Sequence, residues 1–424
     1  MPRPELKNIE LFLQNLEAAP RDANGMPEGA EKLDAQFQKA MRKDSQVFLG
    51  ELLTRFATRP EKSVHRVQTI QLLSSCGWID VRENYIPKRA SPLRASLGIR
   101  FKSTAAAREA VERCGALGGS FREGSETLHR LAGMDVKYSK LRDMTLAFGE
   151  ACLAAQNNPA PDVRTYTKKP TKASQEVPRT LFAMLDGASA NCCKADTVDV
   201  KGKNGEAGTR QVRVGVLGEY GWLDEEGHPV PWRESMSYIV SGECIAEVTS
   251  LTKKHGIARG SGTVPRMQCL ADGEEALEIG LRDAFPHAEF TNDFYHASDH
   301  THALCMNLGL GKDEAQKKYR FLRGLLYRIG ADSVIRHVEA HYAQTLSTCE
   351  TADKELEYLR KRRNNMRYGW LRRNGYLIGS GHVEAAARVL VVRRTKQAGM
   401  HWRHLNAIHM AAILAHYRSQ RKAA

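Results

Sequence analysis

The sequence predicts an α/β protein, with a five-stranded core that is split by a block of helices and preceded by a mainly helical region. Apolar residues recur at helical spacing through residues 1–155 and again from Ala297 to about Arg363. Between these regions, short segments alternate apolar and polar residues, as strands do. The length of 424 residues allows two or three domains, and the hydrophobic content of 42% excludes wholesale disorder.

The N-terminal region, residues 1–155, contains helical patterns such as SQVFLGELLTRFA and one short strand candidate, GWIDVREN. Ser120 and Glu123 have the spacing of a capping box, and Gly133 marks a short turn. Residues 120–150 are therefore compatible with a helix-turn-helix whose second helix, about residues 137–148, enters a major groove. An ordinary helical hairpin fits the same pattern.

Residues 156–180 are rich in Pro, Lys, Thr and Asn and are predicted to be a linker. The expected strands then follow in the order LFAMLDG, RQVRVGVLG, MSYIVSG, VPRMQCLADG and AEFTNDFYH, with the helix EEALEIGLRDAF before the fifth. The core is predicted in two parts, residues 181–298 and 379–424, around a helical insertion at residues 299–378. A final helix is expected after the turn GSG, with Ser380 able to cap it.

Positive charge is concentrated at the C-terminal end. The chain has 63 Lys and Arg against 49 Asp and Glu, a formal charge of +14. From Tyr358 onward there are fifteen Lys or Arg and one acid, Glu384, so this segment alone equals the net charge of the chain. Such a surface attracts polyphosphates, although a solvated helical face gives the same pattern.

Several classes of protein are excluded by composition. No apolar run approaches the eighteen or so residues of a membrane span, and the N-terminus lacks the apolar segment of a secretory signal. Nine scattered cysteines without a C-x-x-C pair do not resemble a disulfide framework. A cytosolic protein with reduced thiols is expected.

Three acids occupy positions that suit metal chemistry. Asp186 and Asp272 end the first and fourth expected strands, and Glu384 lies in the first turn of the last helix. The carboxyl ends of parallel strands converge at one edge of a sheet, and Mg²⁺ prefers oxygen ligands. Asp-Gly after a strand is also ordinary turn chemistry. Asp196 and Asp199, in the polar segment after Asp186, are alternative candidates.

Four segments resemble the DDE transposases of ISKra-type bacterial insertion sequences, which are related to Mutator-like elements. They are LDG at 185–187, LADGEEAL at 270–277, DFYHASDH at 293–300 and, most specifically, RNNMRYGWLRRNGYLIGSGHVEAAARVLVVRRTKQAGMHW at 363–402. The resemblance covers the C-terminal half well and the N-terminal half loosely. It implies an RNase H-like core with a mixed five-stranded sheet, in which an all-helical insertion separates the fifth strand from the last helix.

The resemblance also implies a site. The catalytic, metal-binding triad would be Asp186, Asp272 and Glu384, holding two Mg²⁺ ions, with Mn²⁺ as a substitute. Asp293 and His296 match an Asp-x-x-His element, in which Asp293 has a supporting role and His296 contacts a phosphate; a core histidine packed under Tyr295 is the alternative. Relatives often carry paired zinc-binding cysteines after the strand at IDVRENY, but here YIPKRASP follows, so no structural zinc is predicted.

The function implied is cleavage of element ends and their joining to target DNA, a reaction of DNA recombination. The residues expected to contact DNA phosphates are basic: Arg367, Arg372, Arg373, Arg393, Arg394 and Lys396. The N-terminal helices would recognise the terminal repeats of double-stranded DNA. A homodimer or higher oligomer is implied, in the bacterial cytoplasm and on the nucleoid. The alternatives are a catalytically silent DNA-binding protein and a structure-selective nuclease on the same fold.

Overall fold

The chain forms two compact units, residues 1–148 and 149–424. The computed structural model describes residues 6–21, 32–58, 65–87, 91–162, 166, 168–202, 205–206 and 208–420. The predicted linker at 156–180 therefore lies partly outside the described residues, at 163–165 and 167. Its last six residues, 175–180, belong to the first long strand of the second unit.

The first unit combines helices with an antiparallel hairpin. Its helices are α1 (Lys7–Ala18), α2 (Leu33–Ala57), α3 (Pro92–Ser96), α4 (Ala105–Leu117), α5 (Phe121–Ala132) and the start of α6 (Tyr138–Ala155). The hairpin pairs β1 (Arg66–Ser74) with β2 (Gly77–Tyr85). Strand β1 was not predicted, because the apolar spacing of RVQTIQLLS also fits a helix. Pairing with β2 and packing of Leu72 against Leu53 of α2 select the strand.

Helices α5 and α6 occupy the segment predicted to resemble a helix-turn-helix. Ser120 Oγ accepts a hydrogen bond from the Glu123 backbone N–H at 3.1 Å, which confirms the predicted cap. Gly133 ends α5 with a φ of 62°, a left-handed conformation that glycine adopts without strain. Leu128 of α5 and Leu141 of α6 are buried in one core with Val111 of α4. Function in DNA binding stays a prediction for this region.

One carboxylate in α4 should make the stability of the first unit depend on pH. Burial raises the pKa of Glu112 to about 7, although Arg108, 3.8 Å away, opposes the shift. Between about 4.5 and about 7 the folded state binds more protons than the unfolded state, so stability falls as pH rises through this window. Glu112→Gln is therefore expected to stabilise the unit at pH 8 by roughly 1–3 kcal/mol.

Hydrogen exchange of the α4 amides in the full chain measures this effect. At pH 8 exchange should be slower in Glu112→Gln than in wild type, and the difference should vanish near pH 4. Glu109→Gln is the matched control, since the Glu109 side chain on the same helix is 61% exposed. Equal exchange rates in wild type and Glu112→Gln at pH 8 would contradict the prediction.

The second unit is built on a mixed six-stranded sheet. Its strands are β3 (Gln175–Asn191), β6 (Thr209–Leu223), β7 (Pro229–Pro231), β8 (Ser237–Ser241), β9 (Arg266–Ala271) and β10 (Glu289–Asn292). The order is β10-β9-β3-β6-β7, and β8 also pairs with β6. Strands β10, β9 and β3 are mutually parallel, whereas β6 is antiparallel to β3, β7 and β8. A second, two-stranded ribbon pairs β4 (Lys201–Gly202) with β5 (Gly205–Glu206).

The mixed α/β sheet is confirmed, and two details of the prediction were wrong. The strand count is six instead of five, because the three-residue β7 pairs with β6 at Tyr220 and Leu223, next to the stretch that pairs with β8. Proline is tolerated in β7 since it lies at the edge of the sheet. The segment Phe294–His296 is helical, because Asp293 caps a helix immediately after β10.

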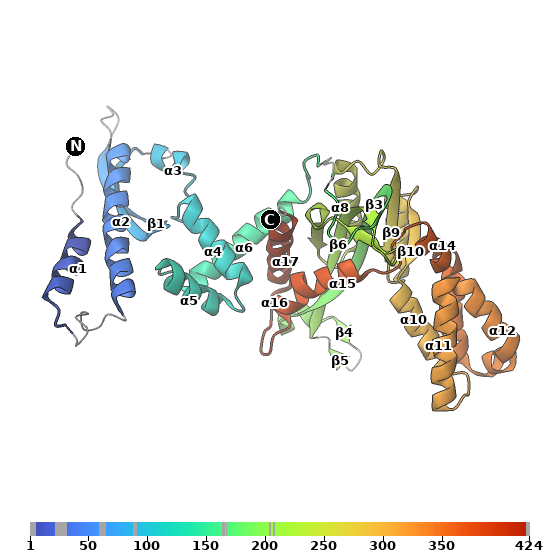
Figure 1. Cartoon of the computed structure of the whole chain (residues 1–424). Coiled ribbons are helices and arrows are strands. Elements are labelled where there is room, and N and C mark those ends of the chain that lie inside the picture. Colours follow the sequence, from blue (N-terminus) through green and yellow to red (C-terminus); the bar gives the residue numbers. More distant parts are fainter. Residues whose placement is uncertain are drawn as a thin grey trace. The chain divides into compact units, whose positions relative to one another are not determined.

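Helices cover both faces of the sheet (Figure 1). They include α8 (Ile245–Ala258), α9 (Glu275–Ala284), α15 (Gly381–Ala387) and α17 (His404–Ser419). Leu181, Ala183 and Leu185 of β3 pack with α8 and α9 on one face. Phe182 points to the other face, where its ring stacks on His382 of α15 at 5.7 Å. Successive side chains of β3 thus point alternately to the face that α8 and α9 cover and to the face that α15 covers.

After α15 the chain continues as a π-helical turn (Arg388–Val392) and α16 (Arg393–Thr395). The predicted final helix therefore ends near Thr395, and α17 is an additional helix that the sequence analysis did not assign. Residues Ala407–Ala415 of α17 are buried, because its run of Ala, Ile, Met and Leu is apolar on every side. The C-terminal segment is thus partly core.

An all-helical insertion follows β10. It contains α10 (Phe294–Met306), α11 (Lys312–Arg328), α12 (Ala331–Thr348), α13 (Glu350–Arg362) and α14 (Tyr368–Arg373). These helices share a core of their own, in which Leu322, Val338 and Leu356 are fully buried. They lie at the β10 end of the sheet in Figure 1. None of the helices in the described part of the chain has the length and apolarity needed to cross a membrane.

Candidate functional site

The sheet register places two of the predicted acids at equivalent positions on neighbouring strands. Parallel pairing of β3 with β9 ends at Met184 and Leu270. Asp186 and Asp272 each follow two residues later, so both are on the same face of the sheet as that last pair. Asp272 directly follows β9, as predicted.

Asp186 does not end its strand, contrary to the prediction. Strand β3 continues to Asn191 because residues 186–191 pair with the long strand β6, from Val214 back to Thr209. The sequence LDGASAN contains a turn-like Asp-Gly, but cross-strand pairing keeps it extended. Asp186 consequently lies where β3 leaves its shorter parallel neighbour, beyond the end of β9.

Glu384 approaches the same face on α15. Burial, together with the negative charges of Asp272 and Glu384, raises the pKa of Asp186 to about 6, against the opposing effects of the Gly187 N–H and Arg213. Asp272 and Glu384 are therefore both close enough to Asp186 to repel its negative charge. The Glu384 side chain is exposed, so this group of carboxylates, hereafter the carboxylate site, is open on one side.

An ion pair beside the carboxylate site connects β6 to the segment that follows β9. Arg213 of β6 lies opposite Gly187 in the register and pairs with Glu274 at 2.7 Å. A side-chain carbon at Gly187 would come within 2.8 Å of the Arg213 guanidinium, which makes glycine suitable there. The backbone N–H of Glu274 in turn donates to Asp272 Oδ1 at 3.0 Å. Together these contacts hold the Asp272 carboxylate.

Asp293 links β10 to the helix that carries Glu384. Its side chain is 1% exposed. Oδ1 accepts from the His296 backbone N–H at 2.7 Å and caps α10. Oδ2 accepts from both the backbone N–H and the hydroxyl of Ser380, at 2.5 and 2.9 Å, just before α15. The predicted supporting role of Asp293 thus has a geometric basis: it positions the start of α15.

His296 contributes its backbone to the cap of α10 and leaves its side chain exposed. The alternative of a core histidine packed under Tyr295 is therefore wrong, because Tyr295 is itself 61% exposed. A phosphate contact by His296 stays a prediction. Ser380 precedes α15, yet none of the described contacts is a hydrogen bond from that helix to its hydroxyl, so the predicted cap is not formed there.

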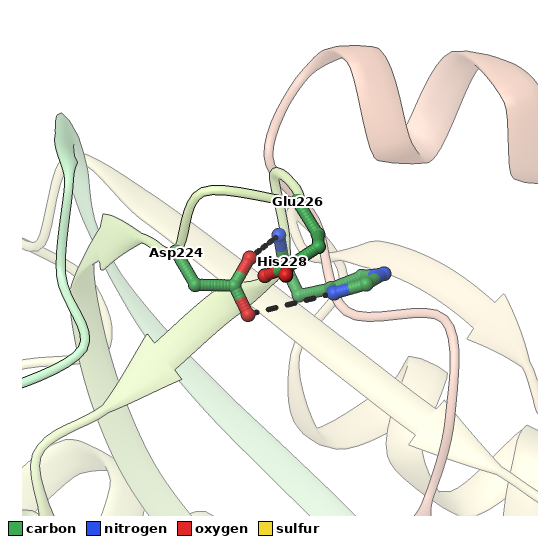
Figure 2. Close-up of side chains that lie close together, drawn as sticks. All are labelled: Asp224, Glu226 and His228. Carbon is green, nitrogen blue, oxygen red and sulfur yellow. Dashed lines mark hydrogen bonds and ion pairs between the residues drawn. The ribbon is translucent and has the colours of Figure 1, made fainter.

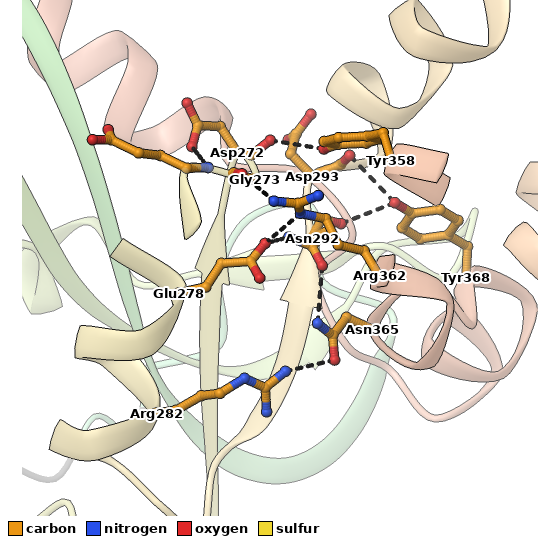
Figure 3. A network of polar contacts seen from close by, with 11 residues as sticks. Asp272, Gly273, Glu278, Arg282, Asn292, Asp293, Tyr358, Arg362, Asn365 and Tyr368 are labelled. Atoms are coloured by element: carbon orange, nitrogen blue, oxygen red, sulfur yellow. Dashed lines mark hydrogen bonds and ion pairs between the residues drawn. The ribbon is translucent and has the colours of Figure 1, made fainter. Parts of the chain in front are cut away.

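Side chains of the helical insertion donate hydrogen bonds to backbone carbonyls at the ends of β9 and β10 (Figure 3). The Tyr358 hydroxyl donates to the Asp272 carbonyl at 3.0 Å, and Arg362 donates to the Gly273 carbonyl at 2.7 Å. The Tyr368 hydroxyl donates to the Asn292 carbonyl at 3.0 Å. Sequence analysis missed these residues as parts of the site. They lie in the basic, aromatic-containing stretch that begins at Tyr358, where Arg362 pairs with Glu278 at 3.0 Å.

A second acidic group is the most compact in the described part of the chain (Figure 2). Among the residues searched there, only Asp224, Glu226 and His228 bring three ligand atoms within 4.8 Å of one another. Asp186, Asp272 and Glu384 do not meet that distance. The turn between β6 and β7 explains the compact group: Asp224 Oδ1 accepts from the His228 N–H at 2.7 Å, and Oδ2 lies 3.5 Å from His228 Nδ1.

The alternative candidate Asp196 has a structural role. Its carboxylate accepts from the His404 N–H at 2.7 Å, at the start of α17, and pairs with Arg403 at 3.3 Å. Asp199 is exposed, and no contact described here links it to the carboxylate site.

The six basic residues predicted to contact phosphates lie in different surroundings. Arg373, Arg393 and Lys396 are exposed, and Lys396 Nζ donates to Ser189 of β3 at 2.7 Å. Arg367 pairs with Glu289 at 2.9 Å.

Two of the six are not simple surface cations. Arg394 is 4% exposed, with its guanidinium 5.3 Å from the centre of the Trp402 ring, so its prediction as a phosphate contact was wrong. Successive residues of an α-helix point about 100° apart, so Arg393 is exposed while Arg394 is buried. Arg372 lines a cavity, where its guanidinium lies 3.8 Å from the centre of the Tyr327 ring.

No family model matches this chain, and no curated protein matches it.

Proposed function

We propose that this protein is a metal-dependent DNA transposase of the DDE class, which cleaves element ends and joins them to target DNA on an RNase H-like core. One observation carries the proposal. Asp186 and Asp272 occupy equivalent positions on adjacent parallel strands, and α15 brings Glu384 to the same face. The three carboxylates thus come from two neighbouring strands and a helix, and the nearby Arg213 is paired with Glu274.

The order of elements supports the fold in this proposal. The insertion α10–α14 stands between the last strand, β10, and α15. An RNase H-like transposase of the ISKra type is expected to have that arrangement. The mixed sheet agrees with it, since β3 pairs antiparallel with β6 and parallel with β9.

The donor set suits hard divalent cations. Three carboxylates supply only oxygen ligands, as Mg²⁺ and Mn²⁺ prefer, and their mutual repulsion is relieved by a cation. When bound, two such ions supply Lewis-acid activation of the attacking oxygen and stabilise the leaving oxygen. Asp186, Asp272 and Glu384 would hold them. Asp293, Tyr358 and Arg362 would keep α15 and the end of β9 in position.

Phosphate binding is assigned to exposed cations around the site. Lys396 contacts Ser189, three residues beyond Asp186 on β3. Arg393 is exposed, three residues before Lys396. The net charge of +14 favours a polyanionic partner. These contacts fix the position of a duplex and carry little sequence preference.

The test uses the full-length protein and a supercoiled plasmid that carries its coding sequence with the native flanking DNA. With Mg²⁺ or Mn²⁺, cleavage at the element ends and joined products are expected, and a chelator should prevent both. Cleavage without any joined product would favour a nuclease on the same fold. Tight binding of this DNA without cleavage in either metal would overturn the proposal in favour of a DNA-binding protein.

A further inference from the structure

A cavity of about 700 Å³ lies between the helical insertion and the segment that leads into α15. Its walls come from α10, α11 and α14, from residues Tyr376–His382, and from the turn Gly227–Pro229. Pockets of about 300–1,000 Å³ are typical of sites for small organic groups. The carboxylates do not line this cavity, and of the six basic residues predicted to contact phosphates Arg372 alone lines it.

Aromatic rings form much of its wall. Phe294, Tyr295, Tyr327 and Tyr376 all line it. Phe294 packs edge-on against Tyr327 at 5.4 Å and fixes that ring. Tyr295 is 61% exposed, so its face is available to a ligand. A side-chain carbon at Gly379 would lie 3.1 Å from the Tyr295 ring, which shows how closely the backbone supports it.

The polar lining is cationic. Arg320, Arg323 and Arg372 contribute to the wall, and no Asp or Glu is among the lining residues that the structure describes. Within the described residues, none of the three arginines forms an ion pair with a carboxylate. The Nε of Arg372 is buried without a hydrogen-bond partner there. Guanidinium groups without acidic partners favour a phosphate-bearing ligand.

The cavity adjoins the carboxylate site through one short segment. Gly379, Gly381 and His382 line it, and Ser380 between them is held by Asp293. Gly381 and His382 belong to the first turn of α15, which also carries Glu384. A ligand in the cavity would therefore contact the helix that presents a carboxylate. A planar anion that is part of DNA fits the rings, the arginines and this proximity.

We infer that the cavity binds an unpaired nucleotide of the DNA strand engaged at the carboxylate site, with its base on Tyr295 and its phosphate near Arg320, Arg323 and Arg372. This inference rests on the proposed function. Bases stack on aromatic side chains without regard to sequence, because every base presents a π-face. Arginine can add both phosphate contacts and cation–π contacts.

Binding of DNA with one unpaired 2-aminopurine nucleotide tests the inference, with the full-length protein and a chelator present. Wild type should bind this DNA about tenfold more tightly than the fully paired duplex, and stacking should quench the 2-aminopurine fluorescence. Tyr295→Ala should lose both the preference and the quenching, whereas Tyr295→Phe should keep them. Phe321→Ala is the matched control, since Phe321 on α11 is 47% exposed and does not line the cavity.

Equal preference in wild type and Tyr295→Ala, or equal loss in Tyr295→Ala and Phe321→Ala, would overturn the inference. Truncation at an exposed ring leaves the core of the insertion intact, so the comparison does not depend on folding. The chelator separates this test from catalysis. Cleavage and joining by a protein without the preference would refute the nucleotide site alone, whereas the preference in a protein that cuts no DNA would refute the proposed function alone.

Discussion

Glu384→Gln should abolish metal-dependent joining of DNA, whereas Asp224→Asn should leave it intact. The glutamine keeps the shape of the side chain and removes one anionic ligand at the carboxylate site. Stabilisation of charge by metal ions is worth several kcal/mol, so a loss of about 1,000-fold in the joining rate is expected, equivalent to about 4 kcal/mol. The joining rate on plasmid DNA with Mg²⁺ measures it.

Asp224→Asn is the matched control because it alters the other acidic group of the second unit. Asparagine can still accept the hydrogen bond from the His228 N–H that shapes the turn. Mn²⁺ at about 100 times its dissociation constant should stabilise wild type and Asp224→Asn by about 2.7 kcal/mol, and Glu384→Gln by much less. If Asp224→Asn loses the metal-induced stabilisation instead, the metal binds at the β6–β7 turn, and the carboxylate site is misassigned.

Asp293→Ala should slow cleavage and joining by about 100-fold, the cost expected when a reacting group is displaced by about 1 Å. The substitution removes the acceptor of the Ser380 N–H and hydroxyl and the cap of α10. Loss of buried acceptors should also destabilise the fold by about 1–3 kcal/mol. DNA binding in a chelator should change less than the rate, because the buried Asp293 carboxylate does not itself contact solvent or DNA.

The single-turnover rate and the affinity for Mn²⁺, measured together, distinguish a positioning residue from a merely structural one. A positioning role predicts weaker Mn²⁺ binding and a slower single-turnover rate at a temperature where Asp293→Ala is fully folded. Asp293→Asn should be intermediate, since it retains one carbonyl acceptor. Asp299→Ala, an exposed acid on the same helix, is the control. Equal rates in the Asp293→Ala and Asp299→Ala proteins would refute the positioning role.

Much of the fold follows from local sequence patterns. The runs RQVRVGVLG, MSYIVSG and VPRMQCLADG lie in β6, β8 and β9, because alternation at period two matches a sheet that is covered differently on its two faces. Strand β1 and helix α17 were not predicted, each for a different reason. The spacing in β1 fits two structures, and α17 is apolar on all sides, so neither carries a clear period.

The candidate site could be predicted as a list of residues. Asp186 and Asp272 are 86 positions apart, and the parallel register of β3 with β9 has the same offset, since Met184 pairs with Leu270. Each aspartate follows an apolar run at the same distance, and this spacing in the sequence indicated that the two acids lie side by side. Asp293 was named from the family resemblance, and its supporting role stays a prediction. The contacts of Tyr358, Arg362 and Tyr368 with the strand ends were not, because they join segments about 70–90 positions apart.

The sequence by itself determined most strands and helices of the second unit, the equal offset of Asp186 and Asp272 past the paired stretch of β3 and β9, and the strongly basic character of one end of the chain. These properties depend on side-chain spacing and charge along the chain. Only the tertiary structure decided that Arg394 is buried while Arg393 is exposed, that Asp293 holds Ser380, and that arginines and tyrosines from three helices enclose one cavity. Burial and partnership depend on long-range packing, which brings together residues that no local pattern relates.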